Sequence, residues 1–117
     1  MKRTVVFYRI ASGCPFENFL DSLPGGIVKK ITWLLAAVEE LEAVEELYFK
    51  RAALHEDILE CNVGCEDAVF RILCFPHKRD LVILWGGISM GFPAMMQEQF
   101  ERALRYKNDF LQRKASP

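Results

Sequence analysis

Apolar and polar positions follow two different spacings in the first third of the chain. Residues 4–10 are rich in β-branched and aromatic side chains, which favours a strand. Apolar residues then recur at helical spacing over 15–23 and again over 27–41. Pro24, Gly25 and Gly26 separate these two segments, and such residues interrupt helices. The pattern predicts a strand followed by two helices.

Three short apolar runs and a long amphipathic segment make up the second half. The runs 58–63, 69–75 and 81–87 are separated by polar residues, which predicts an antiparallel meander. Segment 98–111 has helical spacing, whereas 47–57 has no clear period and is interpreted as a loop. We therefore expect an α+β fold of order β-α-α-β-β-β-α in one domain, residues 1–117. Its helices are expected to pack on one side of a twisted antiparallel sheet.

Composition supports one compact unit. The chain has 117 residues, of which 51% are hydrophobic, enough for one buried core. A net charge of −1 gives no overall attraction for nucleic acid, so any such contact needs a local basic patch. Arg9 interrupts the first apolar run, and no run approaches the roughly 20 residues that cross a bilayer. We expect a cytoplasmic protein without a membrane segment.

Cysteines give no metal pattern. In a cytoplasmic protein the cysteine thiols are expected to stay reduced. Cys61 and Cys65 are four residues apart, but no neighbouring His or Cys completes a zinc spacing. We expect neither a metal site nor a cofactor.

Charged residues gather on two of the expected helices. The second helix carries an acidic cluster of Glu39, Glu40, Glu42, Glu45 and Glu46. The last helix mixes both signs, with Glu98, Glu101 and Asp109 among Arg102, Arg105, Lys107, Arg113 and Lys114. Crowded or mixed charges are typical of solvated faces, and both helices are interpreted in this way.

A single arginine stands inside the middle apolar run and is the first candidate for chemistry. A guanidinium on a central strand needs an anionic partner or an open groove. Arg71 therefore either binds a phosphate or forms a salt bridge to Glu60 on the neighbouring strand. The turn His77-Lys78-Arg79 offers a general base and two cations, or is simply solvated.

Several short segments, in this order and spacing, resemble the phage Gp49-like branch of the RelE/HigB toxin family. The most specific part of the resemblance is the segment FLDSLP (19–24) followed, at the family's spacing, by FRIL (70–73). The resemblance spans nearly the whole chain. It rests on residues 6–8, 19–24, 58–61, 70–73, 81–84 and 101–103. The resemblance implies a small RelE-like sheet with flanking helices.

The resemblance also implies a function, the toxin of a type II toxin–antitoxin system. Such a toxin is a metal-independent endoribonuclease that cuts messenger RNA, in some cases on the ribosome, and a helix-turn-helix antitoxin neutralises it. Cleavage through the RNA 2′-hydroxyl needs a proton acceptor, cations and an acid. Arg71 falls on the family's strand arginine, and Lys50 lies near its basic residues. With His77 these form the expected catalytic set, and the expected RNA-binding residues are Arg51, Asn62, Lys78 and Arg79.

Some family positions differ in this chain. Asn62 replaces an arginine, and the family's lysines fall on Met90, Gly91 and Ala94. Loss of these cations lowers nucleic-acid affinity, because each phosphate contact releases counterions. The alternative is therefore a catalytically degenerate relative that acts through protein contacts. These contacts include a homodimer through Trp85, Met90, Phe92, Met95 and Met96.

Overall fold

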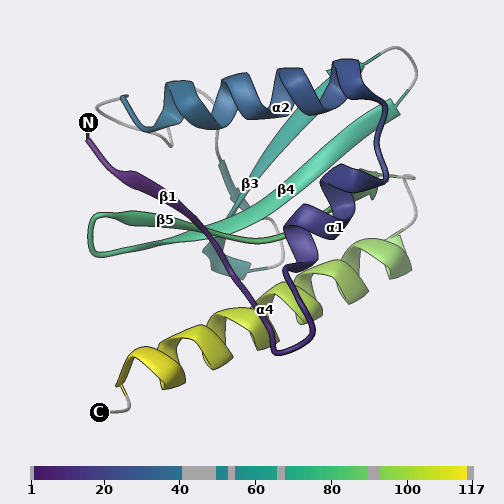
Figure 1. Ribbon diagram of the computed structural model, residues 1–117. Coiled ribbons are helices and arrows are strands. Elements are labelled where there is room, and N and C mark those ends of the chain that lie inside the picture. The colour runs from purple at the N-terminus through teal and green to yellow at the C-terminus, as the bar shows by residue number, and fades with distance from the viewer. Residues whose placement is uncertain (1, 41–49, 53–54, 66–67, 90–92, 116–117) are drawn as a thin grey trace.

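The computed structural model describes residues 2–40, 50–52, 55–65, 68–89 and 93–115 (Figure 1). In chain order the elements are β1 (Thr4–Phe7), α1 (Pro15–Asp21), α2 (Gly25–Val38), β2 (Lys50–Ala52), β3 (His55–Cys65), β4 (Ala68–His77), β5 (Asp80–Ser89) and α4 (Pro93–Ala115). The predicted α+β class is confirmed. β2 is an additional short strand in the segment that was interpreted as a loop.

The strands form one mixed sheet in the order β1-β5-β4-β3-β2. Neighbouring pairs from β2 to β5 are antiparallel, because short turns connect successive strands. β1 instead pairs in parallel with β5, with Val5 opposite Leu81 and Phe7 opposite Ile83. The prediction of an antiparallel sheet is thus wrong for this edge.

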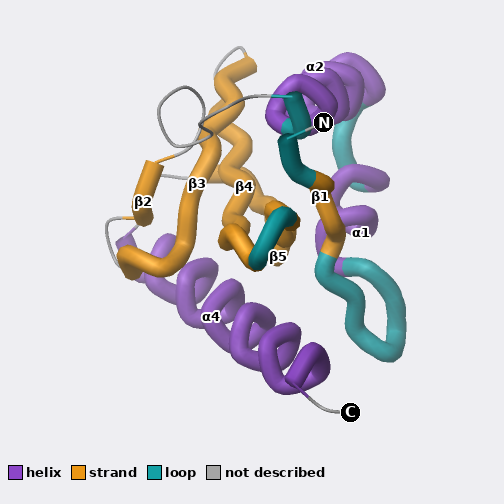
Figure 2. Tube along the Cα trace, turned by 90° about the vertical axis from the view of Figure 1, so that its left-hand side faces the viewer, coloured by secondary structure: helices purple, strands orange, loops and turns teal. Residues whose placement is uncertain are grey.

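Helices cover both faces of the sheet rather than one, so the predicted one-sided arrangement is also wrong. α1 and α2 lie against one face and α4 against the other (Figure 2). The alternation along β4 explains this arrangement. Phe70 and Ile72 pack in the cluster with α1 and α2, whereas Leu73 and Phe75 pack in the cluster with α4. Since both faces of the strand are apolar, both need a cover.

Glu39 secures the outer edge of β1. The amide N–H of Val5 donates to Glu39 Oε2 at 3.0 Å. The backbone N–H groups of Lys2 and Arg3 donate to the carbonyl oxygen of Glu39, at 2.7 and 3.3 Å. Glu39 was expected on a solvated face, yet it satisfies donors at a sheet edge, where unpaired groups invite pairing with other chains. Glu42, Glu45 and Glu46 lie outside the described residues.

Gly86 provides a test of the packing between β5 and α1. A Cβ atom at Gly86 would lie 2.6 Å from Cε2 of Phe19 and 3.0 Å from Cε1 of Phe16. We expect Gly86→Ala to lower the free energy of unfolding by about 1–3 kcal/mol, because two aromatic rings must shift. Gly64→Ala is the matched control, since a Cβ there has nothing within 4 Å. Urea unfolding measures both variants, and equal midpoints would contradict the predicted close approach.

Candidate functional site

Arg71 lies in the middle of β4 and is sealed between the sheet and α4. Its side chain is 6% exposed, and its Nε lies 2.9 Å from Oε2 of Glu60, whose side chain is also 6% exposed. One terminal nitrogen donates to Oε1 of Gln99 at 3.3 Å, and the guanidinium carbon lies 5.6 Å from the ring centre of Phe100. Of the two alternatives for Arg71, the structure shows the salt bridge to Glu60.

The geometry of this ion pair shows what it can and cannot do. Arg71 Nε and Glu60 Oε2 are close, but neither atom has a hydrogen bond of good geometry. Asn62 stands directly opposite Arg71 on β3, is exposed, and brings no charge. A buried pair of this kind is held by charge attraction that offsets the cost of removing both groups from water. In this arrangement Arg71 has no face open to a phosphate.

The expected catalytic residues do not form one site. Arg71 and His77 are six residues apart on the same strand, a separation of about 20 Å in extended backbone. A single phosphodiester cannot contact both groups. In the register of β2 and β3, Lys50 is opposite Glu60 and Arg51 is opposite Leu59. The side chains of Lys50 and Arg51 lie outside the described part of the structure.

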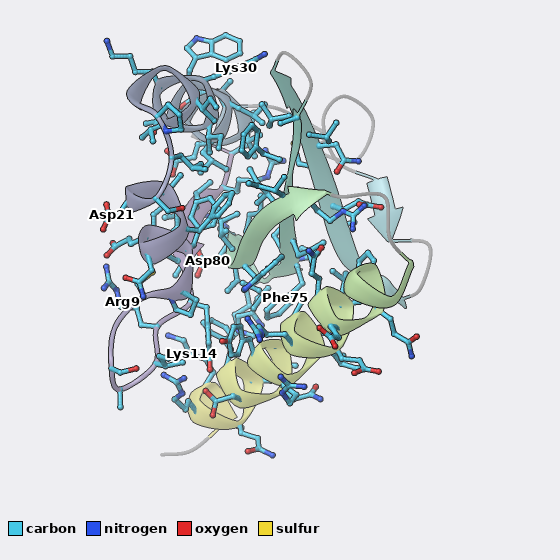
Figure 3. All side chains as sticks on the ribbon, turned by 90° about the vertical axis from the view of Figure 1, so that its right-hand side faces the viewer. Arg9, Asp21, Lys30, Phe75, Asp80 and Lys114 are labelled. Carbon is cyan, nitrogen blue, oxygen red and sulfur yellow. The ribbon has the colours of Figure 1, made fainter. Side chains whose placement is uncertain are left out.

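Basic and aromatic side chains meet at the other end of β4, against the C-terminal half of α4. Figure 3 labels two of them, Phe75 and Lys114. The His77 ring centre is 5.3 Å from that of Phe110 and 6.3 Å from that of Phe75. The Nζ atom of Lys107 is 5.5 Å from the Phe75 ring centre, and that of Lys114 is 5.5 Å from the Phe110 ring centre. These contacts form a continuous row with a lysine at each end, in which the His77 ring lies between the rings of Phe75 and Phe110. We call the group the basic end: His77, Lys78, Arg79, Lys107 and Lys114.

The predicted turn carries two of these cations into solvent. β4 ends at His77 and β5 begins at Asp80, so Lys78 and Arg79 form the connection, as expected from the sequence. Both are exposed, and Lys78 has a φ of 56°, in the left-handed region that non-glycine residues seldom adopt. Asp80 places one negative charge beside them. The tip is therefore a compact, predominantly positive projection.

The acidic residue within this half of α4 is already engaged. Asp109 Oδ2 accepts hydrogen bonds from Arg113 Nε at 2.8 Å and from the Tyr8 hydroxyl at 2.6 Å. The bond from Arg113 holds the pKa of Asp109 below its ordinary value. Burial, together with Asp109, raises the pKa of Tyr8 to about 12. Because Arg113 neutralises Asp109, the charges of the basic end are not cancelled by it.

Lys107 and Lys114 were not singled out from the sequence, although one signal was present. They flank Phe110 at spacings of three and four residues, which places all three on one side of a helix. The mixed charges of the last helix were interpreted as one solvated face. The structure separates them, because Glu98 and Glu101 lie toward the start of α4 and the basic end lies toward its C-terminus.

The expected dimer surface is described in part. Trp85 is half-buried, its ring lies over Gly87, and the guanidinium of Arg102 is 5.9 Å from its ring centre. Met90 and Phe92 lie outside the described residues. Met95 and Met96 are described only by their place in α4. Trp85 therefore packs within this chain rather than projecting from it.

Other parts of the described chain offer different chemistry. A groove of about 250 Å³ lies between β1, α1 and α2, on the face away from Arg71, and is mostly apolar. Burial raises the pKa of the Cys61 thiol to about 12, which leaves it unreactive. Within the described ranges, no three His, Cys, Asp or Glu residues are grouped so as to hold a metal ion. No described helix is long and apolar enough to cross a membrane.

Comparisons with protein-family models, with curated proteins and with solved structures found no significant match to this chain.

Proposed function

We propose that this chain is a toxin of the RelE/HigB type that binds messenger RNA at the basic end. The observation that carries the proposal is the row of lysines and aromatic rings around His77. Lysine and arginine neutralise the phosphates of a nucleic acid, and histidine exchanges protons near neutral pH. In this proposal a helix-turn-helix antitoxin inhibits the toxin, and the toxin cuts messenger RNA in some cases on the ribosome.

The proposed chemistry is cleavage by the RNA's own 2′-hydroxyl. His77 accepts the proton of that hydroxyl, and the 2′ oxygen attacks the neighbouring phosphorus. Lys78 and Arg79 stabilise the negative charge of the crowded phosphorane, as cations do in phosphoryl transfer. The bond from phosphorus to the 5′ oxygen then breaks, and the leaving oxygen takes a proton from water. The products are a 2′,3′-cyclic phosphate and a 5′-hydroxyl.

A second candidate is a noncatalytic relative of this fold that acts through protein contacts. The burial of Arg71 favours it, because the residue that resembles the family's catalytic arginine is paired with Glu60 and covered by α4. In this candidate the basic end binds an acidic partner or RNA without cutting it.

Expression in bacteria, with primer extension on cellular messages, separates the two candidates. The first predicts growth arrest and cut messages for the wild type. His77→Gln should reduce cleavage about 100-fold or more, since general acid–base groups contribute at least this much. Asn108→Ala, an exposed change on α4, is the control and should cleave like the wild type. Uncut messages from the wild type would reject the ribonuclease, and full cleavage by His77→Gln would reject the basic end as its centre.

A further inference from the structure

β1 is an edge strand of the sheet, and only one of its two edges is paired with another strand. The N–H of Tyr8, the residue after β1, donates to the carbonyl oxygen of Ile83 on β5 at 2.9 Å. Because main-chain groups alternate in direction along a strand, those of Val5 and Phe7 face away from β5. The bond from the Val5 N–H to Glu39 shows this outward direction directly.

Glu39 closes only the first part of this outer edge. Its carbonyl and carboxylate oxygens accept from the backbone of Lys2, Arg3 and Val5, as described above. Phe7 is the next residue whose main chain faces outward. Among the hydrogen bonds found between described residues, none joins the outward N–H or C=O of Phe7 to a partner. An unpaired donor and acceptor at a sheet edge can pair with the backbone of an added strand.

The groove between β1, α1 and α2 lies beside this open position. Val5 and Phe7 line it from β1, Leu20 lines it from α1, and Leu35 and Ala36 line it from α2. Figure 2 shows β1 at the end of the sheet, with both helices next to it. The groove holds about 250 Å³, less than the roughly 300–1,000 Å³ of pockets for drug-sized ligands. Its size therefore fits one apolar side chain better than a whole small molecule.

We propose that the outer edge of β1 binds an extended peptide segment of another protein, with one apolar side chain in the groove. The segment runs antiparallel to β1, and one of its residues exchanges two hydrogen bonds with the N–H and C=O of Phe7. Residues directly opposite one another in neighbouring strands project to the same face. The side chain of this residue therefore points as Phe7 does, toward α1, α2 and the groove.

A short segment fits this edge better than the sheet of a second copy. Within β1, all of whose residues are described, Phe7 alone has both main-chain groups facing outward without a bond, and Glu39 closes the edge on one side of it. Two sheets joined edge to edge would need a longer run of open groups. The groove lies on the opposite face of the sheet from α4 and the basic end, so the inference does not depend on the proposed function.

Fluorescence anisotropy of the full chain with a labelled, capped peptide Thr-Val-Leu-Val-Thr tests the proposal. We expect a dissociation constant of about 10–200 μM, because few contacts offset the cost of ordering the peptide. Replacing the leucine by aspartate should weaken binding about tenfold or more, since the groove is mostly apolar. No binding at about 1 mM protein would overturn the proposal, because that concentration exceeds the expected dissociation constant.

Methylation of single peptide nitrogens tests the main-chain pairing. N-methylation of the leucine removes the donor to the Phe7 carbonyl and should weaken binding about tenfold. N-methylation of the valine that follows is the matched control, because its N–H points away from β1 in the antiparallel pairing, and binding should stay within about threefold. Equal losses from the two methylated peptides, or a larger loss from the control, would overturn the proposed pairing.

A variant that fills the groove tests the location. Ala36→Phe adds a ring at an exposed position that lines the groove, and it should weaken peptide binding about tenfold or more. Ala11→Phe is the control, because Ala11 is also exposed but lies in the turn between β1 and α1. Unchanged binding by Ala36→Phe would overturn the groove as the site. Self-association of the wild type in sedimentation equilibrium, lost in Ala36→Phe, would assign the edge to a second copy and overturn the peptide as its occupant.

Discussion

Arg71→Ala is expected to lower the free energy of unfolding by about 3–5 kcal/mol, the typical cost of leaving one partner of a buried ion pair unpaired. The change strands the Glu60 carboxylate, whose side chain is 6% exposed, and removes the donor to Gln99. It also removes the guanidinium beside the Phe100 ring. Since small domains have only about 5–15 kcal/mol of stability, much of the total would be lost. Urea unfolding followed by circular dichroism gives the value.

A paired replacement separates the ion pair from simple loss of volume. Glu60→Leu with Arg71→Met fills the same space with apolar groups and leaves no charge unpaired. We expect this double variant to be within about 1 kcal/mol of the wild type or more stable, because buried ion pairs are often replaced without loss. If Arg71→Ala costs less than about 1 kcal/mol, the guanidinium is open to solvent and the catalytic interpretation of Arg71 regains support.

RNA affinity should fall about 100-fold or more when the four cations of the basic end are replaced by glutamine. Each lost phosphate contact lowers the slope of log affinity against log salt by about 0.7 for a single strand. Loss of Lys78, Arg79, Lys107 and Lys114 should therefore reduce the slope by nearly three. Fluorescence anisotropy with a labelled single-stranded RNA at several salt concentrations measures both quantities.

The control for this experiment must remove charge elsewhere. Arg102→Gln with Arg105→Gln takes two cations from exposed positions of α4 outside the basic end. It is compared with Lys78→Gln plus Arg79→Gln, which makes the same change in net charge at the turn. Equal losses of affinity in these two pairs would mean that RNA responds to overall charge, and the basic end would not be the binding surface.

Local patterns predicted most of the elements because they depend on neighbours in the chain. The apolar runs 58–63, 69–75 and 81–87 lie within β3, β4 and β5, and the turn after His77 is found. The sheet's parallel edge and its two-sided cover were missed. Alternating side chains make both faces of β4 apolar, but an apolar run in the sequence does not predict which helix packs on which face. β2 was missed because three residues carry no period.

The candidate site shows the same division. The sequence by itself determined that Arg71 lies in a central strand and needs either an anionic partner or an open groove. The tertiary structure decided between them, because α4 brings Gln99 and Phe100 over the guanidinium and leaves Glu60 as its partner. It also brought Lys107 against Phe75 and Phe110 against His77, pairs that are more than 30 residues apart in the chain. The sequence supplies the charges. Whether they are buried or grouped depends on which elements, far apart in the sequence, pack against each other in the folded chain.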